Sequence, residues 1–179
     1  RMGEFWMAPG ETMDLYIDLC YLDYLASSTR NTDKPEVPVK PLYTEGSIYD
    51  CINNLPLDNE LEKIRLTAGN PSPKIYSLTA EEMTERIINE YKEAVKRVEA
   101  MDSHPLARKI KLAELKVSCI DGINRADGSR YYSYRLANPD LNPDEIDYTP
   151  DRITEEHRER VLKMIDFKDP LLMINNRNT

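Results

Sequence analysis

The chain has 179 residues, of which 40% are apolar and 31% charged, and its 24 basic and 32 acidic side chains give a formal net charge of −8. This length predicts one domain with enough core to fold without disulfides or metals. The acidic balance argues against direct nucleic-acid binding and against docking on an anionic membrane. It fits either plain solubility or a protein partner with a basic surface.

The cysteines and histidines limit the chemistry further. Cys20, Cys51 and Cys119 are an odd number without close spacing, which favours reduced thiols and a cytoplasmic location. Neither His104 nor His157 has a second histidine or a cysteine at metal-ligand spacing, so we expect no metal and no cofactor. No run of 18 uncharged apolar residues exists, so we expect no membrane span.

The first quarter of the chain predicts a leader, a helix and a linker. We expect residues 1–6 to derive from an expression vector, with the natural start at Met7. Thr12 is placed to cap a helix over 13–28 that is apolar on most sides, and such a helix is either central in a bundle or a partner-binding element. Prolines at every third position predict an extended linker over 27–46, with a proline-rich recognition ligand as the alternative.

Two short helices are expected next. Ser47 begins one that Pro56 stops, and Asn59 with Glu62 forms the capping pattern of another. The sequence over 69–73 then contains one glycine, one asparagine and two prolines, which predicts a break before the next element.

The clearest pattern is a helix pair over 79–121. A capping box at Thr79 starts the first helix, which runs to Met101, and Pro105 suits the first turn of a second helix that stops at Gly122. Apolar residues recur at spacings of three and four along both helices, as in Met83, Ile87, Tyr91, Ala94, Val95, Val98 and Met101, and in Leu106, Ile110, Ala113, Val117 and Ile120. We therefore expect a mainly α fold, an irregular single-domain bundle organised on this hairpin with little or no sheet.

An arginine- and tyrosine-rich run follows two turn-forming Asp-Gly pairs. It consists of Arg130, Tyr131, Tyr132, Tyr134 and Arg135. These residue types are enriched in binding hot spots, so we interpret the run as a partner-binding surface. Stacking on nucleic-acid bases is another use of such a run, and packing of the tyrosines against the bundle is the structural alternative.

The segment 140–159 is strongly acidic. It holds eight acids against two arginines, a net charge of −6, and the acids are Asp140, Asp144, Glu145, Asp147, Asp151, Glu155, Glu156 and Glu159. The residues Asp140-Leu-Asn-Pro-Asp144 are spaced like the first ligands of a calcium-binding loop. Glu145, however, occupies the position at which such a loop needs glycine. Thr154 is expected to cap a last helix over 155–166, followed by a tail over 169–179.

One stretch resembles a known family. Glu90-Tyr-Lys, Arg97-Val98 and His104-Pro-Leu-Ala-Arg-Lys-Ile-Lys-Leu-Ala-Glu-Leu115 resemble the later part of HD-domain phosphohydrolases of the alarmone-hydrolase type. The resemblance aligns Lys111, Ala113 and Glu114 with a family motif in which Glu114 replaces a metal-binding aspartate, and Ser118 stands where the family has asparagine. Residues 1–90 contain no histidine and no His-Asp pair occurs, so the family's earlier metal ligands are missing.

The sequence therefore predicts a non-enzymatic, acidic protein–protein interaction module, an inhibitor or adaptor. We expect it to bind a basic partner surface through the tyrosine run and through Asp140, Asp144, Glu145 and Asp147, with no catalytic or metal-binding residues. The alternative that the resemblance implies is a degenerate HD-type nucleotide phosphohydrolase or nucleotide-binding remnant, with Glu114 as its remaining carboxylate. A structural component of a larger assembly is a third possibility.

Overall fold

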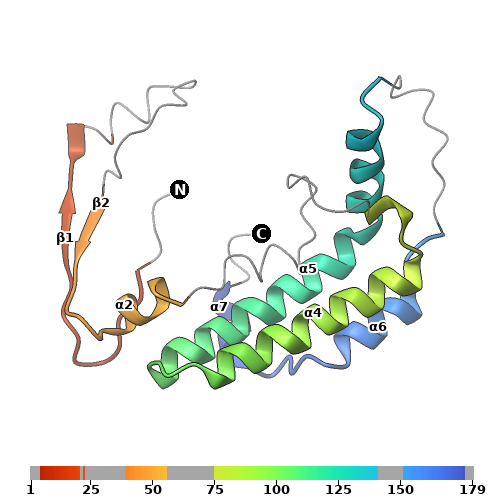
Figure 1. Ribbon diagram of the computed structural model, residues 1–179. Helices are drawn as coiled ribbons and strands as arrows, with labels where there is room; N and C mark the ends of the chain where they lie inside the picture. The colour runs from red at the N-terminus through yellow and green to blue at the C-terminus, as the bar shows by residue number, and fades with distance from the viewer. Residues whose placement is uncertain (1–4, 21, 23–38, 56–74, 141–150, 176–179) are drawn as a thin grey trace. The chain divides into compact units, whose positions relative to one another are not determined.

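The computed structural model describes residues 5–20, 22, 39–55, 75–140 and 151–175. In these ranges the chain forms five α-helices, one 3₁₀ turn and one two-stranded sheet, so the prediction of a mainly α fold with little sheet is confirmed (Figure 1). The chain divides into two compact units, residues 1–55 and 56–179, and each is described by itself. The expectation of a single domain stays a prediction.

The first unit contains the sheet. Strand β1 (Asp14–Ile17) pairs antiparallel with β2 (Val39–Leu42), with Leu15 opposite Pro41. The predicted helix over 13–28 is wrong at β1, while residues 19, 20 and 22 are helical and the remainder of 23–28 lies outside the described residues. A Leu-Tyr-Ile run favours a strand as readily as a buried helix, and pairing with extended backbone decides between them.

Strand β2 lies inside the predicted linker, where the prolines were expected to keep the backbone extended. Helix α2 (Ile48–Asn53) follows, and its predicted cap is confirmed, because the Ser47 hydroxyl accepts a hydrogen bond from the Asp50 amide. The Glu11 carboxylate accepts from the Ile48 amide at 2.8 Å and so ties the N-terminal segment to α2. The small core of this unit consists of Val39, Ile48, Ile52 and Leu55. The second short helix, expected from Asn59, lies outside the described residues.

The second unit is built on the predicted helix pair. After a 3₁₀ turn, η1 (Ile75–Ser77), helix α4 (Ala80–Ala100) begins at the predicted capping box of Thr79 and Glu82. Five of its seven predicted stripe residues are buried, namely Met83, Ile87, Tyr91, Ala94 and Val98. Burial of apolar side chains of this size contributes about 1.5–3 kcal/mol each, so this stripe stabilises the unit far more than helix propensity does.

Helix α5 (Pro105–Ala137) is much longer than predicted. Its N-cap is His104, whose ring nitrogen accepts the Leu106 amide hydrogen. It also continues through Gly122 to Asn138, so the predicted stop is wrong. In Figure 1 its last turns change direction relative to its first part. Gly/Ser pairs are a known cause of helix kinks, and α5 contains one such pair, Gly128 and Ser129.

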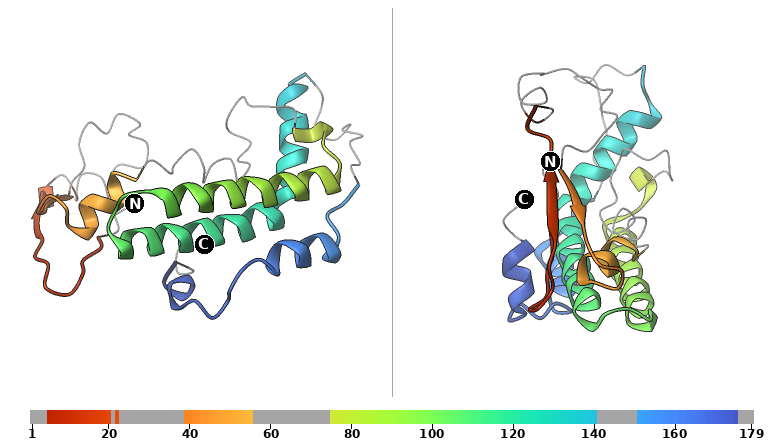
Figure 2. Two further views of the ribbon diagram at one scale, coloured as in Figure 1. Left: turned by 60° about the horizontal axis from the view of Figure 1, so that its bottom comes forward. Right: turned by 90° about the vertical axis from the view of Figure 1, so that its left-hand side faces the viewer.

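Two shorter helices complete the second unit. Helix α6 (Glu155–Leu162) begins at Thr154 as predicted and ends four residues earlier than predicted, and α7 (Pro170–Asn175) lies in the predicted tail. Figures 1 and 2 show α4 and α5 side by side, with α6 running along the pair. Helix α5 contacts η1, α4, α6 and α7, which makes it the central element. Val161 of α6, Leu172 of α7 and Ile165 between the two helices add to the core.

Candidate functional site

The predicted arginine–tyrosine run lies in a helix rather than a loop, and the helix divides it between two sides. Arg130 and Tyr134, four residues apart, face the interior of the unit. Arg130 is only 1% exposed, and the half-buried Tyr134 ring packs edge-on against Tyr76 with 5.5 Å between ring centroids. These two members of the run therefore anchor the last turns of α5.

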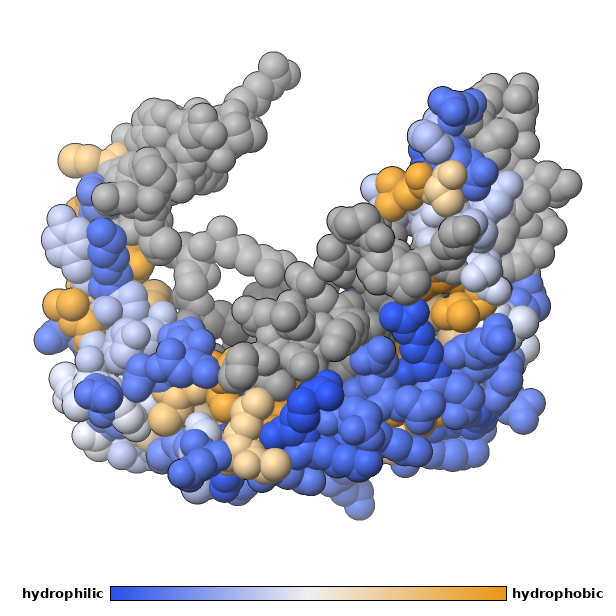
Figure 3. Space-filling view, viewed as in Figure 1, coloured by the Kyte–Doolittle hydropathy of each residue, from blue (hydrophilic) through white to orange (hydrophobic). Residues whose placement is uncertain are grey.

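The other members of the run face outward. Tyr131 and Tyr132 are 38% and 46% exposed, and Arg135 and Leu136 are exposed one turn further along. Residues four apart are neighbours on a helix, so Tyr131 adjoins Arg135 and Tyr132 adjoins Leu136. Together they form one surface, which we call the α5 end face. Figure 3 shows an apolar spot among hydrophilic residues on this projecting end of α5.

The predicted acids are only partly described. Asp140 is exposed, three residues after the end of α5. Asp144, Glu145 and Asp147 lie outside the described residues, so their proximity to the α5 end face stays a prediction.

Arg130 is held by carboxylates that the sequence did not single out as its partners. Its guanidinium donates to the Asp151 carboxylate and to the Asp151 carbonyl, each at 2.7 Å, and lies 3.5 Å from Asp127. The second Asp151 carboxylate oxygen accepts the Ala80 amide at 2.7 Å, and Asp127 accepts the Ile153 amide. The amide of Ala80, and next the Arg130 guanidinium, lower the pKa of Asp151 from its ordinary 3.8. This cluster joins α5, the start of α4 and the segment before α6.

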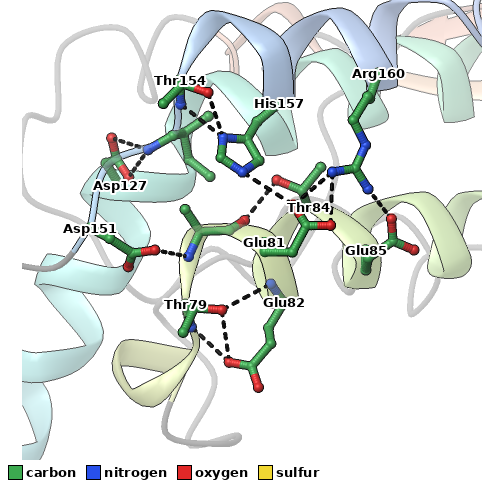
Figure 4. A network of polar contacts seen from close by, with 12 residues as sticks. Thr79, Glu81, Glu82, Thr84, Glu85, Asp127, Asp151, Thr154, His157 and Arg160 are labelled. Carbon is green, nitrogen blue, oxygen red and sulfur yellow. Dashed lines mark hydrogen bonds and ion pairs between the residues drawn. The ribbon is translucent and has the colours of Figure 1, made fainter.

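A second polar cluster joins α6 to α4 (Figure 4). Arg160 donates to both carboxylate oxygens of Glu81, at 2.7 and 2.8 Å, and also to Glu85. The Arg160 guanidinium is the main cause that lowers the pKa of Glu81. The Thr154 amide donates to Nδ1 of His157 at 3.1 Å, so the neutral ring carries its proton on Nε2, which lies 3.3 Å from Glu81.

The residues of the HD-type resemblance lie on the middle of α5. Lys111 is buried and its Nζ lies 2.9 Å from Oε2 of Glu114, close enough for an ion pair but without hydrogen-bond geometry. The buried Ser118 hydroxyl has no hydrogen-bond partner among the residues that the structure describes. Within the described ranges, no group of three or more His, Cys, Asp or Glu side chains could hold a metal ion. The HD-type alternative stays a prediction.

Comparisons with protein-family models, with curated proteins and with solved structures find no match for this chain. None of the helices in the described part of the chain is long and apolar enough to cross a membrane.

Sequence reasoning missed the two clusters for an identifiable reason. Asp127 and Arg130 are three apart, which is an ion-pair spacing only if the helix continues past Gly122. Asp151 meets Ala80 across 71 positions of sequence, and no local pattern signals a contact at that separation.

Proposed function

We propose that this protein is a non-enzymatic interaction module that binds a basic surface of a partner protein, as an inhibitor or adaptor. The contact surface is the α5 end face together with the acids that follow it, Asp140, Asp144, Glu145 and Asp147. The observation that carries the proposal is the division of the tyrosine run, because it leaves two exposed tyrosines on a helix whose other side is anchored.

An anchored helix end is a favourable binding surface for an energetic reason. Ordering flexible side chains on binding costs about 0.5–1.5 kcal/mol for each rotamer-rich side chain, whereas tyrosine has few rotatable bonds and a large contact area. Arg130 and Tyr134 also keep the helix in place before a partner arrives. Exposed aromatic residues beside an arginine are the residue types that dominate interface energies.

The acids would contribute mainly to partner selection and association rate. The segment 140–159 has a net charge of −6 in sequence, and a concentrated charge of this kind attracts a basic surface and repels acidic ones. The proposed surface does not include Arg130, because its guanidinium is buried and donates a hydrogen bond to the Asp151 carboxylate.

Two variants and one charge-matched control test the proposal. The first variant is Tyr131→Ala with Tyr132→Ala, and the second neutralises Asp140, Asp144, Glu145 and Asp147 to the corresponding amides. The control neutralises four exposed acids elsewhere, Glu45, Glu93, Glu99 and Asp102, so its net charge changes equally.

The measurement is capture of proteins from host lysate on each immobilised protein, with the bound species identified and quantified by mass spectrometry at low and high salt. We expect at least one basic protein to lose tenfold or more of its capture with both variants, and to be retained by the control. Equal capture by the acid variant and the control would disprove the acidic surface. Retention by the tyrosine variant would disprove the α5 end face.

A further inference from the structure

The sheet of the first unit exposes several large apolar side chains, namely Leu15, Tyr16, Ile17 and Leu42. All four residues of β1 are exposed, Tyr16 to 60%, and Leu42 on β2 is exposed as well. Successive strand residues point to opposite faces, so Leu15 and Ile17 expose one face of β1 and Tyr16 exposes the other. Isolated two-stranded sheets are marginally stable in water, and exposed apolar patches mark interaction sites. This sheet is therefore a candidate for a third strand.

The two edges of the sheet are not equivalent. In an antiparallel pair, alternate residues direct their N–H and C=O groups away from the partner strand, so β1 offers such groups along its outer edge. Pro41, in the middle of β2, has no N–H to donate, and proline is a common means of blocking an edge. The edge of β1 contains no proline and is the better template.

The charge at β1 favours a basic partner strand. Asp14 begins the strand, is exposed, and takes part in no ion pair within the described residues. A lysine or arginine beside Asp14 on an added strand would form a cross-strand charge pair, which is stabilising, whereas an acid there would be destabilising.

A second copy of the chain fits less well. Every second residue of β1 directs its N–H and C=O groups outward. If two copies pair through this edge with two-fold symmetry, each residue therefore lies opposite a residue whose number differs from its own by an even number. The pairing centred on Tyr16 places Asp14 opposite Asp18 of the other copy twice, and the pairing centred on Leu15 places Asp14 opposite Tyr16, so neither gives Asp14 a basic partner. Directly opposed like charges destabilise a sheet, and each chain also has a net charge of −8.

We infer that the outer edge of β1 binds an extended segment of a partner protein as a third strand, with a lysine or arginine beside Asp14 and apolar side chains beside Leu15 and Ile17. Backbone hydrogen bonds along the edge supply the affinity, and alternate side-chain contacts supply the selectivity. This surface belongs to the first unit and does not depend on the function proposed for the α5 end face.

The test uses the full chain and a defined probe, the fluorescent peptide Lys-Val-Thr-Val-Thr-Val-Lys with blocked ends. Anisotropy measures its binding, and hydrogen–deuterium exchange locates it. We expect slower exchange of the amides of 14–17 and unchanged exchange in α5. Two further peptides are methylated on alternate backbone nitrogens, one at the odd positions and one at the even positions. One of the two should bind at least tenfold more weakly, because strand addition needs its N–H groups.

Charge variants separate recognition from simple apolar adhesion. Asp14→Asn should weaken the lysine-flanked peptide about two- to fivefold, the effect of an exposed charge pair, and a glutamate-flanked peptide should bind wild type more weakly. The variant Tyr131→Ala with Tyr132→Ala should bind the probe normally, so failure of this inference is distinguishable from failure of the proposed function. The inference is overturned by equal binding of all methylated peptides, by unchanged exchange at 14–17, or by concentration-dependent self-association that protects 14–17 without peptide.

Discussion

At the scale of single residues, Arg130 is the largest fully buried side chain in the described part of the chain. Its guanidinium is buried, whereas the side chains of its partners Asp151 and Asp127 are 56% and 36% exposed. If Arg130 is removed, both acids can hydrate, so the loss comes from packing and from the severed link to the segment 151–153. We expect Arg130→Ala to lower the free energy of unfolding by roughly 2–4 kcal/mol and Arg130→Met, which refills the volume, by about half as much.

Urea unfolding followed by circular dichroism measures these losses, and α5 provides a matched control. Arg125 also pairs with an aspartate of α5, Asp121, but its side chain is 68% exposed. Exposed ion pairs contribute little, so Arg125→Ala should cost less than about 1 kcal/mol. Equal effects of the alanine substitutions at 125 and 130 would show that burial of Arg130 does not stabilise the unit.

At the scale of elements, the unexpected length of α5 gives a prediction about its glycines. Helical glycine costs up to about 1 kcal/mol relative to alanine, and a Cβ at Gly128 meets no atom within 4 Å. Gly128→Ala should therefore raise the free energy of unfolding by roughly 0.5–1 kcal/mol. The opposite result is expected in the first unit, where Gly46 has φ of +79° and Gly46→Ala is strained. Thermal unfolding of both variants tests the contrast, and a destabilised Gly128→Ala protein would contradict it.

The helices of this protein were predictable where local signals agree. Capping at Thr79 and an apolar stripe on a helical period lie within the same 21 residues, so α4 was predicted almost to its ends. The end of α5 was not, because the propensity cost at Gly122 is small compared with burial of Ile123, Ala126 and Arg130 beyond it. Strand β1 was missed because its pairing partner lies 22 or more residues further along the chain.

The α5 end face was predictable from the sequence only in part. The arginine–tyrosine run could be identified from composition alone, because it places three tyrosines and two arginines within six residues. Which members face outward depends on the helical phase of α5, and that phase was lost when the helix was predicted to stop at Gly122. Extending the helical period through the run separates Arg130 and Tyr134 from Tyr131 and Arg135 without further information.

At the scale of the whole molecule, stability of the second unit should fall on both sides of neutral pH. In acid the responsible groups are Asp151 and Asp169. Asp151 accepts hydrogen bonds from the Ala80 amide and from Arg130. Asp169 accepts one from the Lys116 ammonium group. These contacts lower the pKa of both carboxyls from 3.8. The unfolded state then binds more protons than the folded state as pH falls below about 4, so the free energy of unfolding decreases there.

In alkali the responsible groups lie in the contact of α4 with α5. Burial raises the pKa of Cys119 to about 12, and burial together with the nearby thiol raises the pKa of Tyr91 to about 12. Each group keeps its proton in the folded state after the unfolded state has lost it. The stability that they contribute is therefore complete below pH 9 and is lost progressively as pH rises toward 12.

Urea unfolding between pH 3 and 11 should accordingly show a plateau between about pH 4 and 9. Asp151→Asn should make the acid limb shallower, with Asp169 still contributing, and leave the alkaline limb intact, because an amide does not titrate. Cys119→Ala should do the reverse, with a uniform loss of about 1 kcal/mol from the small cavity that it leaves. If both variants kept the wild-type profile, the pH dependence would belong to the charge of the whole chain and not to these two contacts. If Asp151→Asn changed only the alkaline limb and Cys119→Ala only the acid limb, the direction of both pKa shifts would be contradicted.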